Sequence, residues 1–250
     1  DSRGWQLPDL VGLCEVENDS VLFDLTKRSL LRNARYEYVM TSSLDIRGID
    51  VALLYSPFSF RLLKADTIRV SLIADMRPTR DILHVEGAIA NGDTLHVLLL
   101  HAPSRTGGEI YSRPFRKHVI KQVSNVVDSI QKYQVHAKII VMGDFNDYAD
   151  SPSLKPLYEC GLLNVSAQAK GKNGAEGTYR YHGEWGSLDQ ILISDNLRPY
   201  VLSCYVNDAP FLLEEDMKYG GVKPRRHYNG MRYNNGFSDH LPLVLRLSIP

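Results

Sequence analysis

The chain has 250 residues, of which 44% are hydrophobic and 23% are charged, and this describes one globular domain with a sizeable core. Its 29 Lys and Arg balance its 29 Asp and Glu, so no global field indicates nucleic acid or acidic membranes, and any charge argument for DNA must be local. The three cysteines, Cys14, Cys160 and Cys204, are odd in number and far apart, which excludes a disulfide framework and a zinc site as expectations.

The chain shows no apolar run of transmembrane length and no signal peptide, so membrane insertion is not expected. It opens abruptly at Asp1, as a mature or trimmed form would, and export therefore stays open. We expect a monomer, and the compartment is not predicted.

The first half of the chain is rich in strand-like runs. We predict strands over 8–16, 35–40, 49–56, 58–72, 81–90 and 94–100, because these runs are apolar and bounded by turn residues. Asn91-Gly92 is the strongest hairpin signal and joins the last two of them. A helix is predicted from Asp19, which can cap it, to about Arg32.

The second half begins with the longest predicted helix, from about Ser112, its expected cap, to Tyr133, with Pro114 in the first turn. A buried strand follows over 137–142, and a short helix over 151–159. Further strands are predicted over 187–194, 199–206 and 243–247. The stretches 164–186 and 207–237 are predicted to be irregular loops, and loops of that length are often functional.

Polar side chains follow several of the predicted strands at the point where each ends, and these are Glu15, His101, Asp144 with Asn146, Asp189, and Asp239 with His240. Between Asp144 and Asn146, Phe145 is expected to point into the core. Taken singly, each polar residue is as well explained by a turn or a solvated strand end. The adjacent pair Asp239-His240 before a buried strand is the hardest to explain without a function.

Carboxylates, a carboxamide and histidines without cysteine suit a hard divalent cation, Mg²⁺ or Mn²⁺. They also suit attack of water on phosphorus, which needs a cation, a base and donors around the phosphate oxygens. A histidine beside a carboxylate can be held in one tautomer or kept protonated. The remaining histidines, His84, His96, His118, His136 and His182, are predicted to be structural or solvent-exposed.

At these residues the sequence resembles the endonuclease/exonuclease/phosphatase superfamily, the deoxyribonuclease-I-like metal-dependent phosphoesterases, with variants similar to Bacteroides-type members. The matching motifs occur in the family's order and are Leu13-Cys14-Glu15-Val16-Glu17, Leu99 to Arg105, Gly143-Asp144-Phe145-Asn146, Ser187 to Leu192, and Ser238-Asp239-His240. The resemblance implies a four-layer α/β/β/α sandwich, in which two mixed sheets face each other with helices outside.

The resemblance also implies a role for each matching residue. Glu15 resembles the main metal ligand and Asp239 a second carboxylate near the metal. Asp144 and Asn146 resemble the pair that positions or deprotonates the water and holds a phosphate oxygen. His240 resembles the general base or phosphate-binding histidine, oriented by Asp189.

His101 resembles a second phosphate-binding histidine, and Arg105 a helper that binds substrate. Asp50 is a further candidate for orienting a histidine or a metal-bound water. One departure concerns the start of the chain, because family members begin with a strand whose Asn joins the metal site. No such strand precedes Glu15 here. The single domain, residues 1–250, is therefore expected to lack one interior strand of a sheet.

These observations predict a metal-dependent phosphodiesterase acting on DNA. One alternative is a phosphatase or phosphodiesterase for a small or lipid-linked phosphate, of the inositol phosphate or sphingomyelin type. The inositol-phosphatase variants of the motifs are not present. A second alternative is a non-catalytic phosphate-binding module. The basic loop Lys223–Arg232, with interleaved tyrosines, has two interpretations, as a phosphate- and base-binding segment or as a solvated loop packing on itself.

Overall fold

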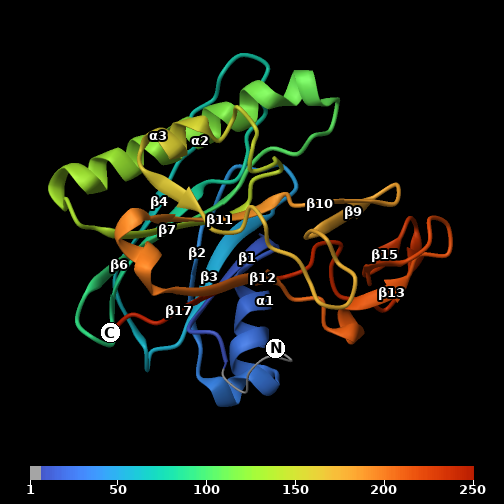
Figure 1. Ribbon diagram of the computed structural model, residues 1–250, viewed down its shortest axis with the longest axis horizontal. Coiled ribbons are helices and arrows are strands. Elements are labelled where there is room, and N and C mark those ends of the chain that lie inside the picture. Colours follow the sequence, from blue (N-terminus) through green and yellow to red (C-terminus); the bar gives the residue numbers. More distant parts are fainter. Residues whose placement is uncertain (1–6) are drawn as a thin grey trace.

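The structure, a computed structural model, describes residues 7–250 and has four layers, as predicted: helices, a sheet, a second β layer and further helices (Figure 1). Three clusters of buried apolar side chains fill the spaces between the layers. The cluster between the two β layers includes Leu53 from one and Val97, Leu99 and Ile191 from the other. Alternation of apolar residues along the strands places one face of each strand in this central core.

The first β layer is a six-stranded mixed sheet in the order β4-β5-β6-β7-β11-β8. Its strands are β4 (Phe60–Ile68), β5 (Ile82–Ile89), β6 (Thr94–His101), β7 (Lys138–Asp144), β11 (Asp189–Ser194) and β8 (Leu162–Asn164). Only the central pair β6–β7 is parallel, and the long helix α2 (Glu109–Tyr133) makes the crossover between them. Together with α3 (Lys155–Glu159), α2 covers the outer face of this sheet (Figure 1).

The second β layer consists of two antiparallel pieces. One has the order β1-β3-β2, with β1 (Leu10–Val16), β3 (Asp50–Tyr55) and β2 (Glu37–Met40), and the other pairs β12 (Val201–Val206) with β17 (Leu243–Leu247). Within residues 7–250, the outer edges of β1 and β17 pair with no further strand, and both line one cavity of about 2410 Å³. This second layer is therefore open along one line between its two pieces.

The helical layer under β1, β3 and β2 differs in detail from the prediction. It consists of α1 (Asp19–Phe23), a π-helical turn (Asp24–Arg28) and a 3-10 helix (Leu30–Ala34). The cap is Asn18, whose side chain accepts a hydrogen bond from the Val21 N–H, so the expected cap at Asp19 is wrong. No helix in the described part of the chain is both long and apolar enough to cross a membrane.

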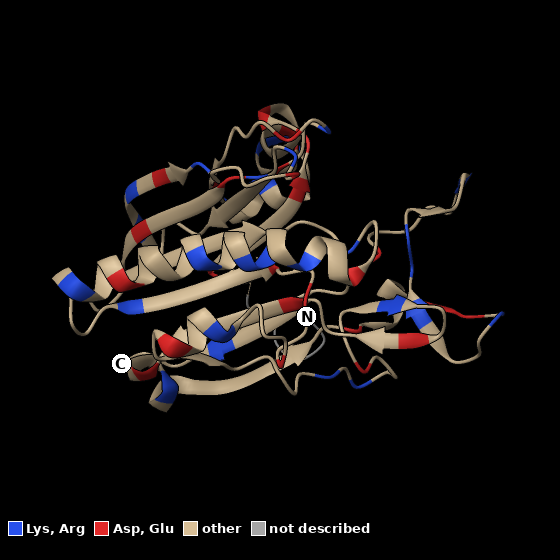
Figure 2. Cartoon of the chain, turned by 90° about the horizontal axis from the view of Figure 1, so that it is seen from above, with Lys and Arg blue, Asp and Glu red and all other residues tan. Residues whose placement is uncertain are grey.

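The start of α2 was also predicted one turn too late. The helix begins at Glu109, after Gly108, and Ser112 lies inside it with its hydroxyl donating to the Gly108 carbonyl. The expected cap at Ser112 is therefore wrong. Pro114 is accommodated within the helix and not in its first turn. Figure 2 shows basic and acidic residues interspersed along α2, in agreement with the balanced composition.

The two stretches predicted to be irregular contain short hairpins, so that prediction is wrong in part. These are β9 (Tyr179–Tyr181) with β10 (Glu184–Gly186), β13 (Leu213–Glu215) with β14 (Val222–Pro224), and β15 (Tyr228–Asn229) with β16 (Arg232–Tyr233). Two further 3-10 helices span Asp195–Tyr200 and Pro210–Leu212. In Figure 1 the hairpins form an extension beside the ends of the central strands.

Candidate active site

Three neighbouring strands place a histidine and two carboxylates side by side. His101 at the end of β6 pairs with Asp144 on β7, and Asp144 pairs with Asp189 at the start of β11. Because directly paired residues point to the same face, these side chains form one row at the rim of the sheet. Gly143 permits the approach, since a Cβ there would lie 1.9 Å from the Leu100 carbonyl oxygen and its φ is +137°.

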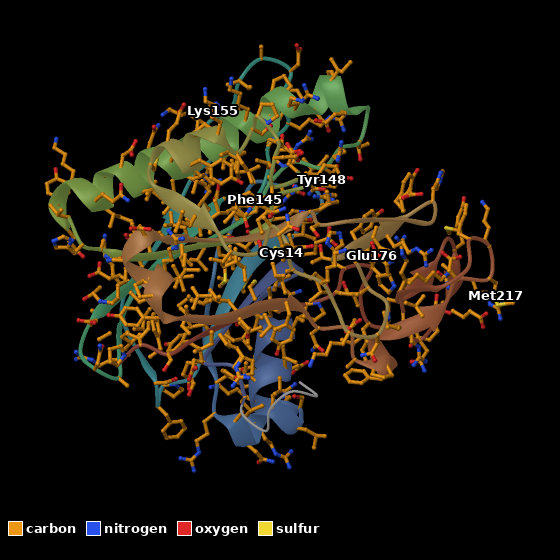
Figure 3. All side chains as sticks on the ribbon, in the orientation of Figure 1. Cys14, Phe145, Tyr148, Lys155, Glu176 and Met217 are labelled. Atoms are coloured by element: carbon orange, nitrogen blue, oxygen red, sulfur yellow. The ribbon has the colours of Figure 1, made fainter. Side chains whose placement is uncertain are left out.

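The segment after β7 turns sharply and fixes Asn146 beside Asp144. Asn146 has a left-handed φ of 49°, and its backbone N–H donates to Asp144 Oδ1 at 2.8 Å. Its Nδ2 donates to Asp144 Oδ2 at 3.2 Å and to the Ala102 carbonyl at 3.1 Å. Phe145 is fully buried, as predicted, and its N–H donates to the Leu188 carbonyl, so it locks the turn to the core (Figure 3).

His240 reaches this row from a distant part of the chain. Its Nδ1 lies 2.7 Å from Asp189 Oδ2, and an isolated bridge to Tyr179 holds its backbone. Burial by itself lowers the pKa of His240, but the hydrogen bond to Asp189 and the charges of Asp189 and Asp144 outweigh it and raise the pKa to about 9. The ring is therefore a cation at neutral pH.

Asp144 and His101 are shifted in the opposite sense, toward their neutral forms. Burial and the nearby charge of Asp189 raise the pKa of Asp144 to about 7. Burial and the charge of Arg80 hold the pKa of His101 well below its usual range, although its Nε2 lies 3.3 Å from Asp144 Oδ2. Arg80 is itself buried and paired with Asp45 at 3.0 Å. The row thus contains groups with widely separated proton affinities, which is typical of catalytic sites.

Two carboxylates at the rim of the cavity are less engaged. Glu15 lies at a bulge of β1 with a left-handed φ of 60°, and its exposed side chain forms, among residues 7–250, one ion pair, with Arg47 at 3.9 Å. The carboxylate of Asp239 is half-buried and, within the described residues, makes no hydrogen bond or ion pair. Both line the cavity that contains the row.

The described residues contain one group of acidic and histidine side chains that could hold a metal ion, and it consists of Asp144, Asp189 and His240. Their ligand atoms lie within 4.8 Å of one another. However, His240 Nδ1 and Asp189 Oδ2 are engaged with each other at 2.7 Å, and a histidine whose pKa is raised to about 9 is protonated at neutral pH and is no metal ligand. The unengaged carboxylates of Glu15 and Asp239 have the donor chemistry that a hard cation requires.

Arg105 and Asp50 have different surroundings from those expected. Arg105 lines the cavity, but its guanidinium is paired with Glu109 at 2.8 Å and lies over the Tyr148 ring, with 4.9 Å to the centroid. Asp50 accepts hydrogen bonds from the Thr41 hydroxyl and the Ser43 N–H. No hydrogen bond or ion pair joins Asp50 to a histidine in the described part of the chain, so its expected orienting role is not seen there.

The structure brings all eight predicted site residues to one cavity, and they are Glu15, His101, Arg105, Asp144, Asn146, Asp189, Asp239 and His240. Five of them, His101, Asp144, Asn146, Asp189 and His240, are joined by direct contacts. Sequence reasoning missed Arg80 and Tyr179. Arg80 carried no local signal, whereas Tyr179 begins the alternating segment Tyr179-Arg180-Tyr181-His182-Gly183, whose glycine marks a hairpin turn.

The fold and the site together define a family of phosphoesterases. The profile of the Endonuclease/Exonuclease/phosphatase family matches residues 2–248, and the chain belongs to this family. Its members are phosphoric ester hydrolases, and the chain is accordingly an enzyme of that class. No curated protein matches the chain in a direct comparison.

Solved structures with the same fold include three that span nearly all of this chain. Human nocturnin, in its catalytic domain, has a TM-score of 0.62 at 19% identity over 96% of this chain and 80% of that chain. A Bacteroides thetaiotaomicron protein of the endonuclease/exonuclease/phosphatase family has a TM-score of 0.66 at 16% identity, covering 96% and 83%. A mannosyl-6-phosphatase of the same organism has a TM-score of 0.66 at 15% identity, covering 96% and 85%.

Proposed function

We propose that the protein is a divalent-metal-dependent phosphodiesterase that cleaves DNA by attack of water. The observation that carries the proposal is the in-register row His101, Asp144 and Asp189, with His240 hydrogen-bonded to its end. Around the same space the row offers Asp144, whose pKa lies near neutral pH, the cation His240 and the neutral donor His101. This combination supports in-line attack on a phosphate, where a proton is removed and negative charge develops.

Glu15 and Asp239 would hold Mg²⁺ or Mn²⁺, which when bound supplies positive charge to offset the charge that develops on the phosphate. Asp144, with a pKa of about 7, accepts the proton of the attacking water. Asn146 donates from its backbone N–H and from Nδ2 to the two oxygens of Asp144, and this holds the carboxylate in place beside a phosphate oxygen.

His240 acts as a cation that donates from Nε2 to a non-bridging phosphate oxygen while Asp189 fixes Nδ1. His101 is neutral at working pH and adds a second donor or acceptor without adding charge. Arg105 binds the substrate beside this row, once it exchanges its ion pair with Glu109 for a phosphate.

The test compares hydrolysis of bis-p-nitrophenyl phosphate and p-nitrophenyl phosphate with Mg²⁺, with Mn²⁺ and with EDTA. We expect metal-dependent cleavage of the diester, loss of that cleavage in His240→Ala, and no loss in His136→Ala, which replaces an exposed histidine. Plasmid and oligonucleotide DNA are then the next substrates. Equal cleavage by His240→Ala and the parent protein would remove the proposal.

A second candidate is a phosphatase for a sugar phosphate or another small or lipid-linked phosphate. It is favoured by the likeness to a mannosyl-6-phosphatase, at the level of fold. Cleavage of p-nitrophenyl phosphate without cleavage of the diester would select it. If Asp144→Asn and the parent protein bound substrate equally and neither turned it over, the chain would be a phosphate-binding module.

The proposal also covers the organisation of the chain. We infer that residues 1–250 act as one domain, because the core clusters join both β layers and the helices outside them. We also propose that the protein is a monomer. The open edges of β1 and β17 support the further expectation that one more strand completes the second layer. Higher metal-dependent activity of a longer chain that supplies such a strand would support this expectation.

A further inference from the structure

A row of aromatic rings leads away from His240 along the β9–β10 hairpin. The Tyr179 ring lies 4.8 Å from that of His240, between centroids, and 6.4 Å from that of Tyr181, to which it is nearly parallel. The next ring, His182, is stacked at 4.1 Å on Tyr181 and at 6.1 Å on Tyr219. The row therefore begins at the phosphate-facing histidine and continues to the exposed tip of the hairpin.

The turn that presents this row is tight and conformationally fixed. Tyr181 pairs with Glu184, so only His182 and Gly183 form the loop, and both have positive φ, 50° and 86°. Such two-residue turns match the twist of the two strands and hold them in one register. A Cβ at Gly183 would lie 2.8 Å from the Cβ of Tyr219, so the tip of the hairpin is packed against the β13–β14 turn.

Arg180 clamps the same hairpin from its buried side. Its Nε donates to the Gly183 carbonyl at 3.0 Å, and its two terminal nitrogens donate to the carbonyls of Val222 and Gly220. The guanidinium is also paired with the buried Asp216 at 3.6 Å. Because an arginine that is buried, paired and hydrogen-bonded in this way loses little further freedom on binding, the aromatic row is preorganised.

The row is open to a ligand and has two cations beside it. The residue exposures of Tyr181 and Tyr219 are 60% and 43%. Arg226 lies over the Tyr179 ring at 5.3 Å and Lys218 over the Tyr219 ring at 4.8 Å. Neither cation has a carboxylate within ion-pair distance in the part of the chain that the structure describes.

The other tyrosine cluster of this region has a different arrangement. Tyr228 and Tyr233 pair across β15–β16 and meet each other and His227 edge to face. These edge-to-face contacts join the three rings to one another within the β15–β16 hairpin, whereas Arg226 of the same basic loop lies over Tyr179. The rings of the β9–β10 row instead stack nearly parallel on one another, and the exposed surface of Tyr181 and Tyr219 is where a further planar group can add to the stack.

We propose that this row is a binding subsite for the bases of single-stranded nucleic acid next to the phosphate at His240. The proposal deepens and rests on the proposed phosphodiesterase function. Planar bases stack on tyrosine and histidine faces whatever their sequence, and Arg226 and Lys218 offset the charge of the backbone. A duplex would keep its bases stacked inside and would not use the row. A sugar phosphate could cover one ring but would leave the rest of the row and Lys218 unused.

The test measures binding of a fluorescein-labelled thymidine octanucleotide by anisotropy in EDTA, so that no turnover is required. We expect Tyr181→Ala to raise the Kd roughly five- to one-hundredfold, as loss of one stacked base would. Tyr181→Trp, which keeps a stacking face at an exposed position, should bind as tightly as the parent protein. Tyr133→Ala, which removes an exposed tyrosine at the far end of α2, should not change the Kd.

Three results would overturn the subsite. These are an unchanged Kd in Tyr181→Ala, equal binding of the octanucleotide and its duplex, and displacement of the octanucleotide by mannose 6-phosphate at lower concentration than by thymidine 5′-monophosphate. Hydrolysis of methyl p-nitrophenyl phosphate by the parent protein separates the two proposals, since this diester carries no base. If that diester is cleaved and the Kd pattern is absent, only the subsite fails. If nothing is cleaved and the pattern is present, only the phosphodiesterase function fails.

Discussion

The substitution Asp189→Asn tests the electrostatic basis of the site most directly. It keeps the shape of the side chain that holds His240 Nδ1 at 2.7 Å but removes its charge. The pKa of about 9 for His240, against an ordinary 6.5, corresponds to about 3 kcal/mol in favour of the cation. Without that charge, burial opposes the cation and only the charges of Asp144 and Asp239 still favour it, so we expect the pKa of His240 to fall and the neutral ring to gain population at pH 7 to 8.

We expect kcat/KM for bis-p-nitrophenyl phosphate at pH 7.5 to fall roughly 10²- to 10³-fold in Asp189→Asn, because a cation facing the phosphate is lost. The assay is a pH–rate profile from pH 5 to 10, with an NMR titration of the His240 ring in both proteins. The matched control is Asp195→Asn, which removes an exposed carboxylate six residues further along the chain.

The same substitution has a signed effect on stability. Because the folded pKa of His240 is raised, its stabilisation is fully present below pH 6.5 and is lost as pH rises through about 9. The parent protein should therefore lose stability between these values relative to Asp189→Asn, measured by urea unfolding. An unchanged His240 pKa in the variant, or an alkaline profile identical to the parent's, would refute the electrostatic reasoning.

Three further predictions use other parts of the site. Asp144→Asn should raise the free energy of unfolding by a few kcal/mol at pH 8 and by little at pH 4, because the raised folded pKa of about 7 makes the parent protein less stable as pH rises from 4 to 7. Denaturant unfolding at both pH values measures these gains, and equal gains would contradict the prediction. Glu15→Gln should raise the Mg²⁺ concentration for half-maximal thermal stabilisation roughly tenfold or more, whereas Glu17→Gln, the exposed control, should not. Gly143→Ala should lower the free energy of unfolding by roughly 3 kcal/mol or more, because it combines backbone strain with a clash. Gly161→Ala, at a position with positive φ but open space, should lower it by about 1 to 2 kcal/mol. Equal losses of stability in the two variants on thermal unfolding would show that the clash at Gly143 is relieved.

Local pattern was sufficient for much of the fold. The alternating and continuous apolar runs predicted the strands that became β1 to β7, β11, β12 and β17, and the helical period predicted α2. Boundaries were less certain, because a cap depends on which side chain reaches a free N–H. Asn18 and Asp19 are equivalent in type, and only the folded backbone decided that Asn18 caps the first helix.

The short hairpins were not predicted because their strands are only two or three residues long and do not contribute to a main sheet. Their stability comes from contacts with other loops, as the Arg180 clamp illustrates. The contacts from Arg180 to Gly220 and Val222 join residues about forty positions apart, so a sequence pattern over roughly ten or twenty residues does not reveal them. The same clamp joins the β9–β10 hairpin to the β13–β14 turn, where Tyr219 lies beside His182 and extends the aromatic row.

The sequence by itself determined which residues stand at the strand ends, because strand termini and residue types are local properties. Only the tertiary structure decided that β6, β7 and β11 bring His101, Asp144 and Asp189 into one register, and that His240 closes on Asp189 from 51 residues away. It also set the opposite pKa shifts of His240 and Asp144, since burial and neighbouring charge depend on packing and not on residue identity.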